Sequence, residues 1–116
     1  MPLYHREIFM PAKIAKLERT TLAPEITSHA RDAAAGDRYG KMTIPASITF
    51  CGRDVVEAEI DGGKVKKLVV RVHYDETRDG VYVLGIDNGR VFYKTAWFNL
   101  SSDVHATLKR HLYAVR

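Results

Sequence analysis

The sequence is poor in cysteine and has no long hydrophobic run: Cys51 is its one cysteine among 116 residues. A single cysteine excludes an internal disulfide and any zinc site built from several cysteines. No apolar stretch approaches the roughly 20 residues that span a bilayer, and the first residues lack the apolar core of a secretion signal. We therefore expect a cytoplasmic protein, or one released without such a signal, that has no membrane partner.

The sequence also lacks the short motifs of metal and cofactor chemistry. It contains no HExxH, no phosphate-binding glycine loop, no CxxC and no pair of histidines at metal-ligand spacing. We therefore expect neither a metal ion nor a cofactor. Chemistry in this protein would depend on imidazole, cationic and hydroxyl side chains.

The composition is that of one ordinary globular domain with a mild excess of positive charge. Hydrophobic residues make up 46% and charged residues 28%, and 18 Lys and Arg stand against 14 Asp and Glu. The resulting net charge of +4 is compatible with a polyanionic partner such as RNA or DNA. Charge alone does not decide the partner, because many basic domains of this size bind no nucleic acid.

One helix is predicted over residues 24–35. Pro24 suits a first turn because its missing N–H would have no helical partner there, and Gly36 is a typical C-terminal stop. Ile26 and three alanines at helical spacing give a narrow face that can approach a sheet closely. Residues 1–23 are apolar and basic with two prolines, and are read as an N-terminal arm that either forms a short helix or packs on a partner.

The pattern changes to period two after the helix. Pro45 leaves residues 42–50 as at most a short edge strand, and Asp87-Asn88-Gly89 is a strong hairpin signal. The predicted strands are 55–60, 64–74, 81–86 and 90–98. Together these elements predict an α+β domain over residues 24–116. Its main helix packs on a four-stranded antiparallel sheet, with short extra helical segments at the termini.

The last strand and its polar exit, residues 90–108, carry the most informative pattern. Strict alternation places Tyr93, Thr95 and Trp97 on one face and Lys94 on the other. Trp97 is then expected to be largely buried between the sheet and the small-residue face of the helix. Side chains of Leu68, Val70, Val72, Tyr82, Leu84 and Ile86 are expected to line the same layer.

Several side chains could carry chemistry. Lys67, Arg71 and His73 share one strand face, where a cation and an imidazole two residues apart can bind an anion together; the alternative is a solvated strand face. His29 lies at the edge of the apolar face of the helix, where it is either structural or functional. His105 follows the last strand in a polar loop.

Segments spread along residues 25–110 resemble one family of proteins. The segments are Ile26–Arg31, Val55–Glu59, Lys67–Arg71, Val81–Leu84, Lys94–Asn99 and Asp103–Leu108. They are similar to the barnase/EndoU/colicin/RelE-like ribonuclease toxins, in particular to a small phage- and toxin-associated branch. That branch shows a His-Ala start on its helix, a strand ending in Arg, and a K-T-x-W-x-N…D-x-H-x-T-L finish.

The resemblance implies RNA cleavage on the open face of the sheet, in the host cytoplasm if the chain is phage-encoded. The catalytic residues it implies are His29, Arg71, Lys94, His105 and Thr107. Further nucleic-acid contacts are assigned to Arg38, Lys41, Lys67, His73 and Asn99. The predicted function is thus a metal-independent endoribonuclease, and the expected partners are RNA and a host or inhibitor protein. The alternative is a catalytically inactive relative that binds nucleic acid or a host protein.

Overall fold

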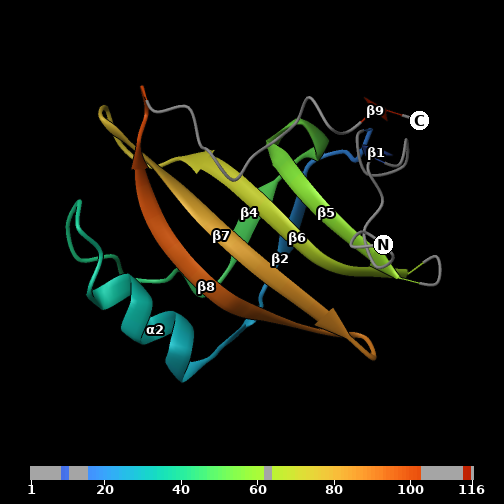
Figure 1. Ribbon diagram of the computed structural model, residues 1–116, viewed down its shortest axis with the longest axis horizontal. Coiled ribbons are helices and arrows are strands. Elements are labelled where there is room, and N and C mark those ends of the chain that lie inside the picture. The colour runs from blue at the N-terminus through green and yellow to red at the C-terminus, as the bar shows by residue number, and fades with distance from the viewer. Residues whose placement is uncertain (1–8, 11–15, 62–63, 103–113, 116) are drawn as a thin grey trace, which may run out of the picture.

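The protein is a mostly β structure in which a five-stranded mixed sheet is the largest element, as a computed structural model shows (Figure 1). The structure describes residues 9–10, 16–61, 64–102 and 114–115. The sheet has the order β3-β8-β7-β6-β5. Its strands are β3 (Glu25–Ile26), β5 (Val55–Asp61), β6 (Lys64–His73), β7 (Arg78–Asp87) and β8 (Arg90–Leu100).

Four of these strands form the antiparallel meander that the period-two pattern predicts. β5 to β8 pair antiparallel in chain order, and the β7–β8 hairpin turns at Asn88 and Gly89 with φ of 50° and 79°. Left-handed backbone at both turn positions explains why Asn and Gly stand there. The four strands and this hairpin are confirmed.

The predictions of an α+β domain and of a four-stranded, wholly antiparallel sheet are wrong, because the described residues are mostly β and the sheet has a fifth strand. β3 adds a fifth strand at the β8 edge and pairs parallel to it, with Glu25 opposite Phe92 and Ile26 opposite Tyr93. A two-residue strand is too short to show alternation, and Pro24 before it resembled a helix start. The helix α2 (Ser28–Ala35) therefore begins later than predicted, although Gly36 ends it as expected.

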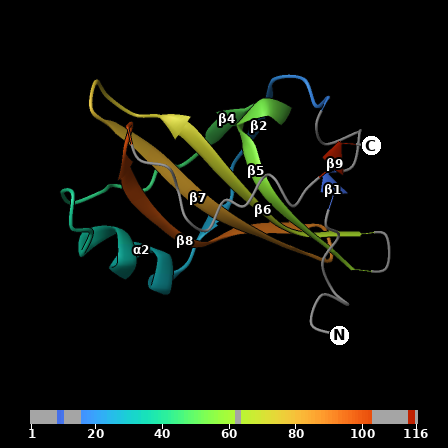
Figure 2. The same ribbon diagram turned by 45° about the horizontal axis from the view of Figure 1, so that its top comes forward.

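The expected helical segments at the termini are also not seen in the described residues there. β1 (Phe9–Met10) and β9 (Ala114–Val115) instead pair as short parallel strands. Within the expected arm, β2 (Thr20–Leu22) pairs antiparallel with β4 (Ile48–Phe50). The β2–β4 pair lies behind the meander and crosses it (Figures 1 and 2).

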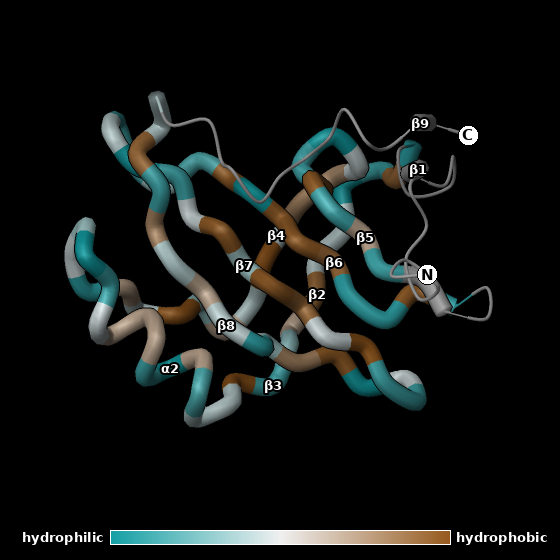
Figure 3. Tube along the Cα trace, in the orientation of Figure 1, coloured by the Kyte–Doolittle hydropathy of each residue, from teal (hydrophilic) through white to brown (hydrophobic). Residues whose placement is uncertain are grey.

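The main core fills the space between one face of the meander, α2 and the β2–β4 pair. The hydrophobic residues along the middle of β6 and β7 are visible in Figure 3. This core contains Ala30 and Ala34 of α2, Ile48 and Phe50 of β4, Leu68 and Val70 of β6, Tyr82 and Leu84 of β7, and Tyr93, Ala96 and Phe98 of β8, with Val72 and Ile86 packed against it. The expected layer formed by β6 and β7 side chains against the helix is confirmed.

Tyr93 joins this core to the segment before β4. Its side chain is fully buried, and its hydroxyl donates to the carbonyl oxygen of Pro45 at 2.9 Å. Burial, with a smaller contribution from Tyr82, raises the pKa of Tyr93 to about 12 from 10.0. The neutral phenol is therefore favoured in the folded protein.

This pKa shift makes stability fall at alkaline pH. Because the pKa is higher in the folded than in the unfolded chain, the stabilisation is complete below pH 10 and is lost as pH rises toward 12. We expect the Tyr93→Phe variant to lose less stability than the wild type over this interval in urea unfolding. Equal alkaline losses in the two proteins would contradict the assignment.

Candidate functional site

The face of the meander that points away from the main core is the candidate site, and we call it the open face. Cross-strand pairing sets Val69, Val83 and Thr95 in one row, Arg71, Val81 and Trp97 in the next, and His73, Asp79 and Asn99 in the last. A small hydrophobic cluster of Val56, Val69, Val81 and Val83 occupies its middle, and these four side chains are buried, at most 8% exposed. Polar side chains lie at both ends of this cluster.

A β-bulge at Lys94 decides which β8 side chains reach the open face. Val83 pairs with Thr95 whereas Leu84 pairs with Tyr93, so Lys94 is an extra residue. Tyr93 and Ala96 are both fully buried in the main core, and Lys94 between them is exposed. Bulges re-aim side chains in this way and are frequent next to active sites.

The bulge overturns the predicted alternation along β8. Tyr93 faces the main core, but Thr95 and Trp97 lie beyond the bulge and face the other way. Trp97 is half-buried and packs on the valine cluster of the open face. The prediction that it lies between helix and sheet is therefore wrong, and Phe98 takes that place in the core.

Thr27 fixes the start of α2 beside the bulge. Its hydroxyl donates to the carbonyl oxygen of Tyr93 at 2.7 Å and accepts from the Ala30 N–H at 3.1 Å. The same side chain thus caps the helix and ties it to β8. Sequence analysis missed this positioning residue, although a Thr just before a helical Ser-His-Ala is a recognisable N-cap signal.

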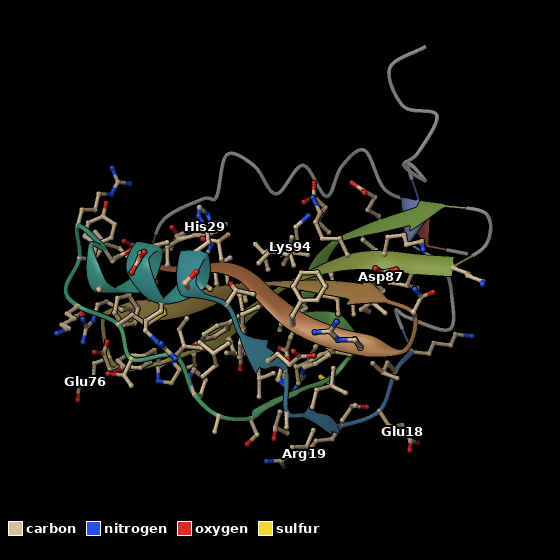
Figure 4. All side chains as sticks on the ribbon, turned by 90° about the horizontal axis from the view of Figure 1, so that it is seen from below. Glu18, Arg19, His29, Glu76, Asp87 and Lys94 are labelled. Atoms are coloured by element: carbon tan, nitrogen blue, oxygen red, sulfur yellow. The ribbon has the colours of Figure 1, made fainter. Side chains whose placement is uncertain are left out.

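His29 and Lys94 are brought to the same side of the molecule by these contacts. Both side chains are exposed, and Figure 4 shows them on the same side of the β8 ribbon, while Glu18, Arg19 and Glu76 lie on the other side. His29 lies two residues beyond the Thr27 cap, and Lys94 adjoins the carbonyl that Thr27 binds. An imidazole and an ammonium group are thereby presented at one edge of the open face.

Arg71 holds the far end of the open face together. Its Nε donates to Asp79 Oδ2 at 2.9 Å and its Nη2 donates to the Leu100 carbonyl at 3.2 Å. Asp79 Oδ1 also accepts from the Ser101 hydroxyl at 3.1 Å. Arg71 therefore connects β6, β7 and the end of β8, close to Asn99, which is buried in the same region.

The other predicted nucleic-acid contacts do not form one patch. Lys67 pairs with Glu57 at 3.4 Å and with Glu59 at 3.9 Å, so its charge on the open face is compensated. Arg38 stacks over the Tyr39 ring at 4.7 Å in the loop after α2. Lys41 and His73 line two separate hollows, which lie beside α2 and at the end of β6. His105 and Thr107 lie outside the described residues.

Arg78 anchors the loops next to this end of the sheet. It donates two hydrogen bonds to Asp75 Oδ2, at 2.9 and 2.6 Å, and a third to the Tyr39 carbonyl at 3.0 Å. Its guanidinium also lies 4.4 Å from the Phe98 ring centroid. The hydrogen bonds from the Arg78 side chain to Asp75, with smaller contributions from the Thr77 and Arg78 backbone N–H groups, hold the pKa of Asp75 at about 2, so the carboxylate stays charged at any physiological pH.

Comparisons with protein-family models, with curated proteins and with solved structures gave no match. Among the described residues, no three His, Cys, Asp or Glu side chains gather in a way that could hold a metal ion. No helix in that part of the chain is long and apolar enough to cross a membrane.

Proposed function

We propose that the protein cleaves RNA without a metal ion, at the edge of the open face where His29 and Lys94 lie. The observation that carries this proposal is that Lys94, the extra residue of the β8 bulge, and His29 project on the same side of β8. A proton-transfer group and a cation are the minimum that metal-independent cleavage of a phosphodiester needs. The resemblance to ribonuclease toxins points to the same two residues.

In the proposed reaction, the 2′-hydroxyl of one nucleotide attacks its own 3′-phosphorus. The His29 imidazole takes the hydroxyl proton, and the new O2′–P bond forms as the P–O5′ bond breaks. The Lys94 ammonium stabilises the negative charge that builds on the phosphoryl oxygens. The leaving 5′-oxygen takes up a proton from a second acid, for which the resemblance offers His105. The products are a 2′,3′-cyclic phosphate and a 5′-hydroxyl.

Arg71 has a positioning role in the proposed reaction, and the buried Asn99 lies beside it. Arg71 hydrogen-bonds to Asp79 and to the Leu100 carbonyl, so it positions the exit of β8, the strand that carries Lys94. Thr95 and Trp97 lie between these groups and the bulge on the same face. A hydroxyl and a half-buried ring there can contact a ribose or stack on a base.

The decisive experiment incubates the purified protein with labelled single-stranded RNA in excess EDTA. We expect cleavage that persists in EDTA and leaves 2′,3′-cyclic phosphate ends, while a DNA strand of the same sequence stays intact because it lacks the 2′-hydroxyl. Absence of cleavage at micromolar protein, or cleavage that EDTA abolishes, would overturn the proposal.

The second candidate function is nucleic-acid binding without cleavage. Exposed cations in the described part, among them Arg38, Lys41 and Lys94, support this candidate. Ionic binding to RNA should weaken steeply with salt, because each neutralised phosphate releases counterions. Tight, salt-dependent binding of RNA that remains intact would select this function, and salt-insensitive affinity would point to a protein partner.

A further inference from the structure

A hollow of about 430 Å³ lies at the end of β6, between that strand, β4 and the short 3₁₀ helix η1 (Gly52–Asp54). The residues that line it are Arg19, Thr49, Phe50, Cys51, Arg53, Asp54, Val72 and His73. It differs in its lining residues from the edge at which His29 and Lys94 project. Two arginines and a histidine from three separate segments converge on it.

The two arginines of the hollow differ from the cations that hold the fold through ion pairs. Lys67, Arg71, Arg78 and Arg90 each pair with a carboxylate within 4.0 Å. Within the part of the chain that the structure describes, neither Arg19 nor Arg53 forms an ion pair. Two unpaired guanidinium groups around one hollow attract an anion.

The acidic residue of the hollow is already engaged. Asp54 Oδ2 accepts the backbone N–H of Cys51 at 2.9 Å and the Cys51 thiol at 3.4 Å. This carboxylate therefore holds the turn of η1 instead of pairing with either arginine. Both donors are neutral, so Asp54 keeps its negative charge, and with His73 neutral the two arginines leave the hollow a net charge of +1.

The segments that carry the arginines are tied to each other. The Gly52 N–H donates to the Leu17 carbonyl at 2.8 Å, and Thr20 pairs with Phe50 where β2 meets β4. Arg19 and Arg53 each lie next to one of these residues in sequence. Their backbones are thus placed before any ligand arrives, which lowers the entropic cost of binding.

We propose that this hollow binds a phosphate group. A guanidinium presents a planar fork of donors that matches phosphate oxygens, and two such forks with an imidazole can satisfy several oxygens at once. The phosphate could be free in solution or part of a nucleic-acid strand. The assignment holds whether or not the protein cleaves RNA, because it depends on charge and geometry at the end of β6.

The first test titrates ¹⁵N-labelled full-length protein with inorganic phosphate, using chloride at equal ionic strength as the reference. We expect phosphate, but not chloride, to change the amide chemical shifts of residues in and around Cys51–Asp54. Arg53→Gln and Arg19→Gln should each weaken phosphate binding about tenfold, as the loss of a charge-assisted hydrogen bond implies. Lys64→Gln, an exposed charge at the other end of β6, is the matched control and should bind as the wild type does.

The second test measures the binding of a labelled single-stranded DNA by fluorescence anisotropy. DNA lacks the 2′-hydroxyl, so this measurement is independent of the proposed cleavage. A loss of affinity in the Arg19→Gln/Arg53→Gln double variant would identify a strand phosphate as the ligand, whereas loss of inorganic phosphate binding alone would identify free phosphate. Shifts no larger than those with chloride, or a double variant that binds both probes like the wild type, would overturn the proposal.

Discussion

Replacing His29 by alanine is expected to lower the rate of RNA cleavage about 10²- to 10⁴-fold, the usual contribution of one positioned proton-transfer group. His29 is exposed on the first turn of α2, so its removal should leave the fold and its stability unchanged. Lys94→Gln is expected to lower the rate about 10²- to 10³-fold, as loss of a group that stabilises transition-state charge does. Initial rates on a fluorogenic oligoribonucleotide in EDTA give both numbers.

Arg31→Ala is the matched control for His29, because it is an exposed residue two positions further along the same helix. We expect this variant to cleave RNA at close to the wild-type rate. A His29→Ala protein as active as the Arg31→Ala protein would remove His29 from the mechanism. A pH–rate profile that loses its acidic limb in the His29 variant would support its role as a base.

Replacing Phe98 by alanine is expected to destabilise the protein by about 3–5 kcal/mol, a large part of the total for a domain of this size. The ring is 1% exposed in the main core and packs edge-on against Tyr74, with their centroids 4.6 Å apart. The Arg78 guanidinium also lies over the Phe98 ring, so the substitution removes a contact of the residue that anchors the neighbouring loops. Urea unfolding followed by circular dichroism measures the change.

Trp97→Ala is the companion variant, because the neighbouring residue points to the opposite face of β8. Trp97 is half-buried on the valine cluster of the open face, so its loss should cost clearly less than that of Phe98. If strict alternation held along β8, Trp97 would be the core residue and the order of the two costs would be reversed. A larger loss from Trp97→Ala would therefore contradict the bulge at Lys94.

Much of the sheet could be predicted because its signals are local. Alternating apolar residues along β6 and β7 and the Asn88-Gly89 turn depend on neighbours within a few positions, and the observed strands follow them closely. The fifth strand could not be predicted in this way. Glu25–Ile26 is a strand because β8 offers it a free edge, and two residues carry no periodicity of their own.

The same distinction between local and distant signals applies to the candidate site. The sequence by itself determined which side chains are present: an imidazole on the helix, cations on β6 and β8, and little cysteine for metal or disulfide chemistry. The tertiary structure decided which of them meet. One extra residue in β8 places Trp97 on the face away from the helix, and Lys67 and Arg71 form ion pairs with carboxylates. Such outcomes depend on pairing register and on partners distant in sequence, and the period of a single strand contains neither.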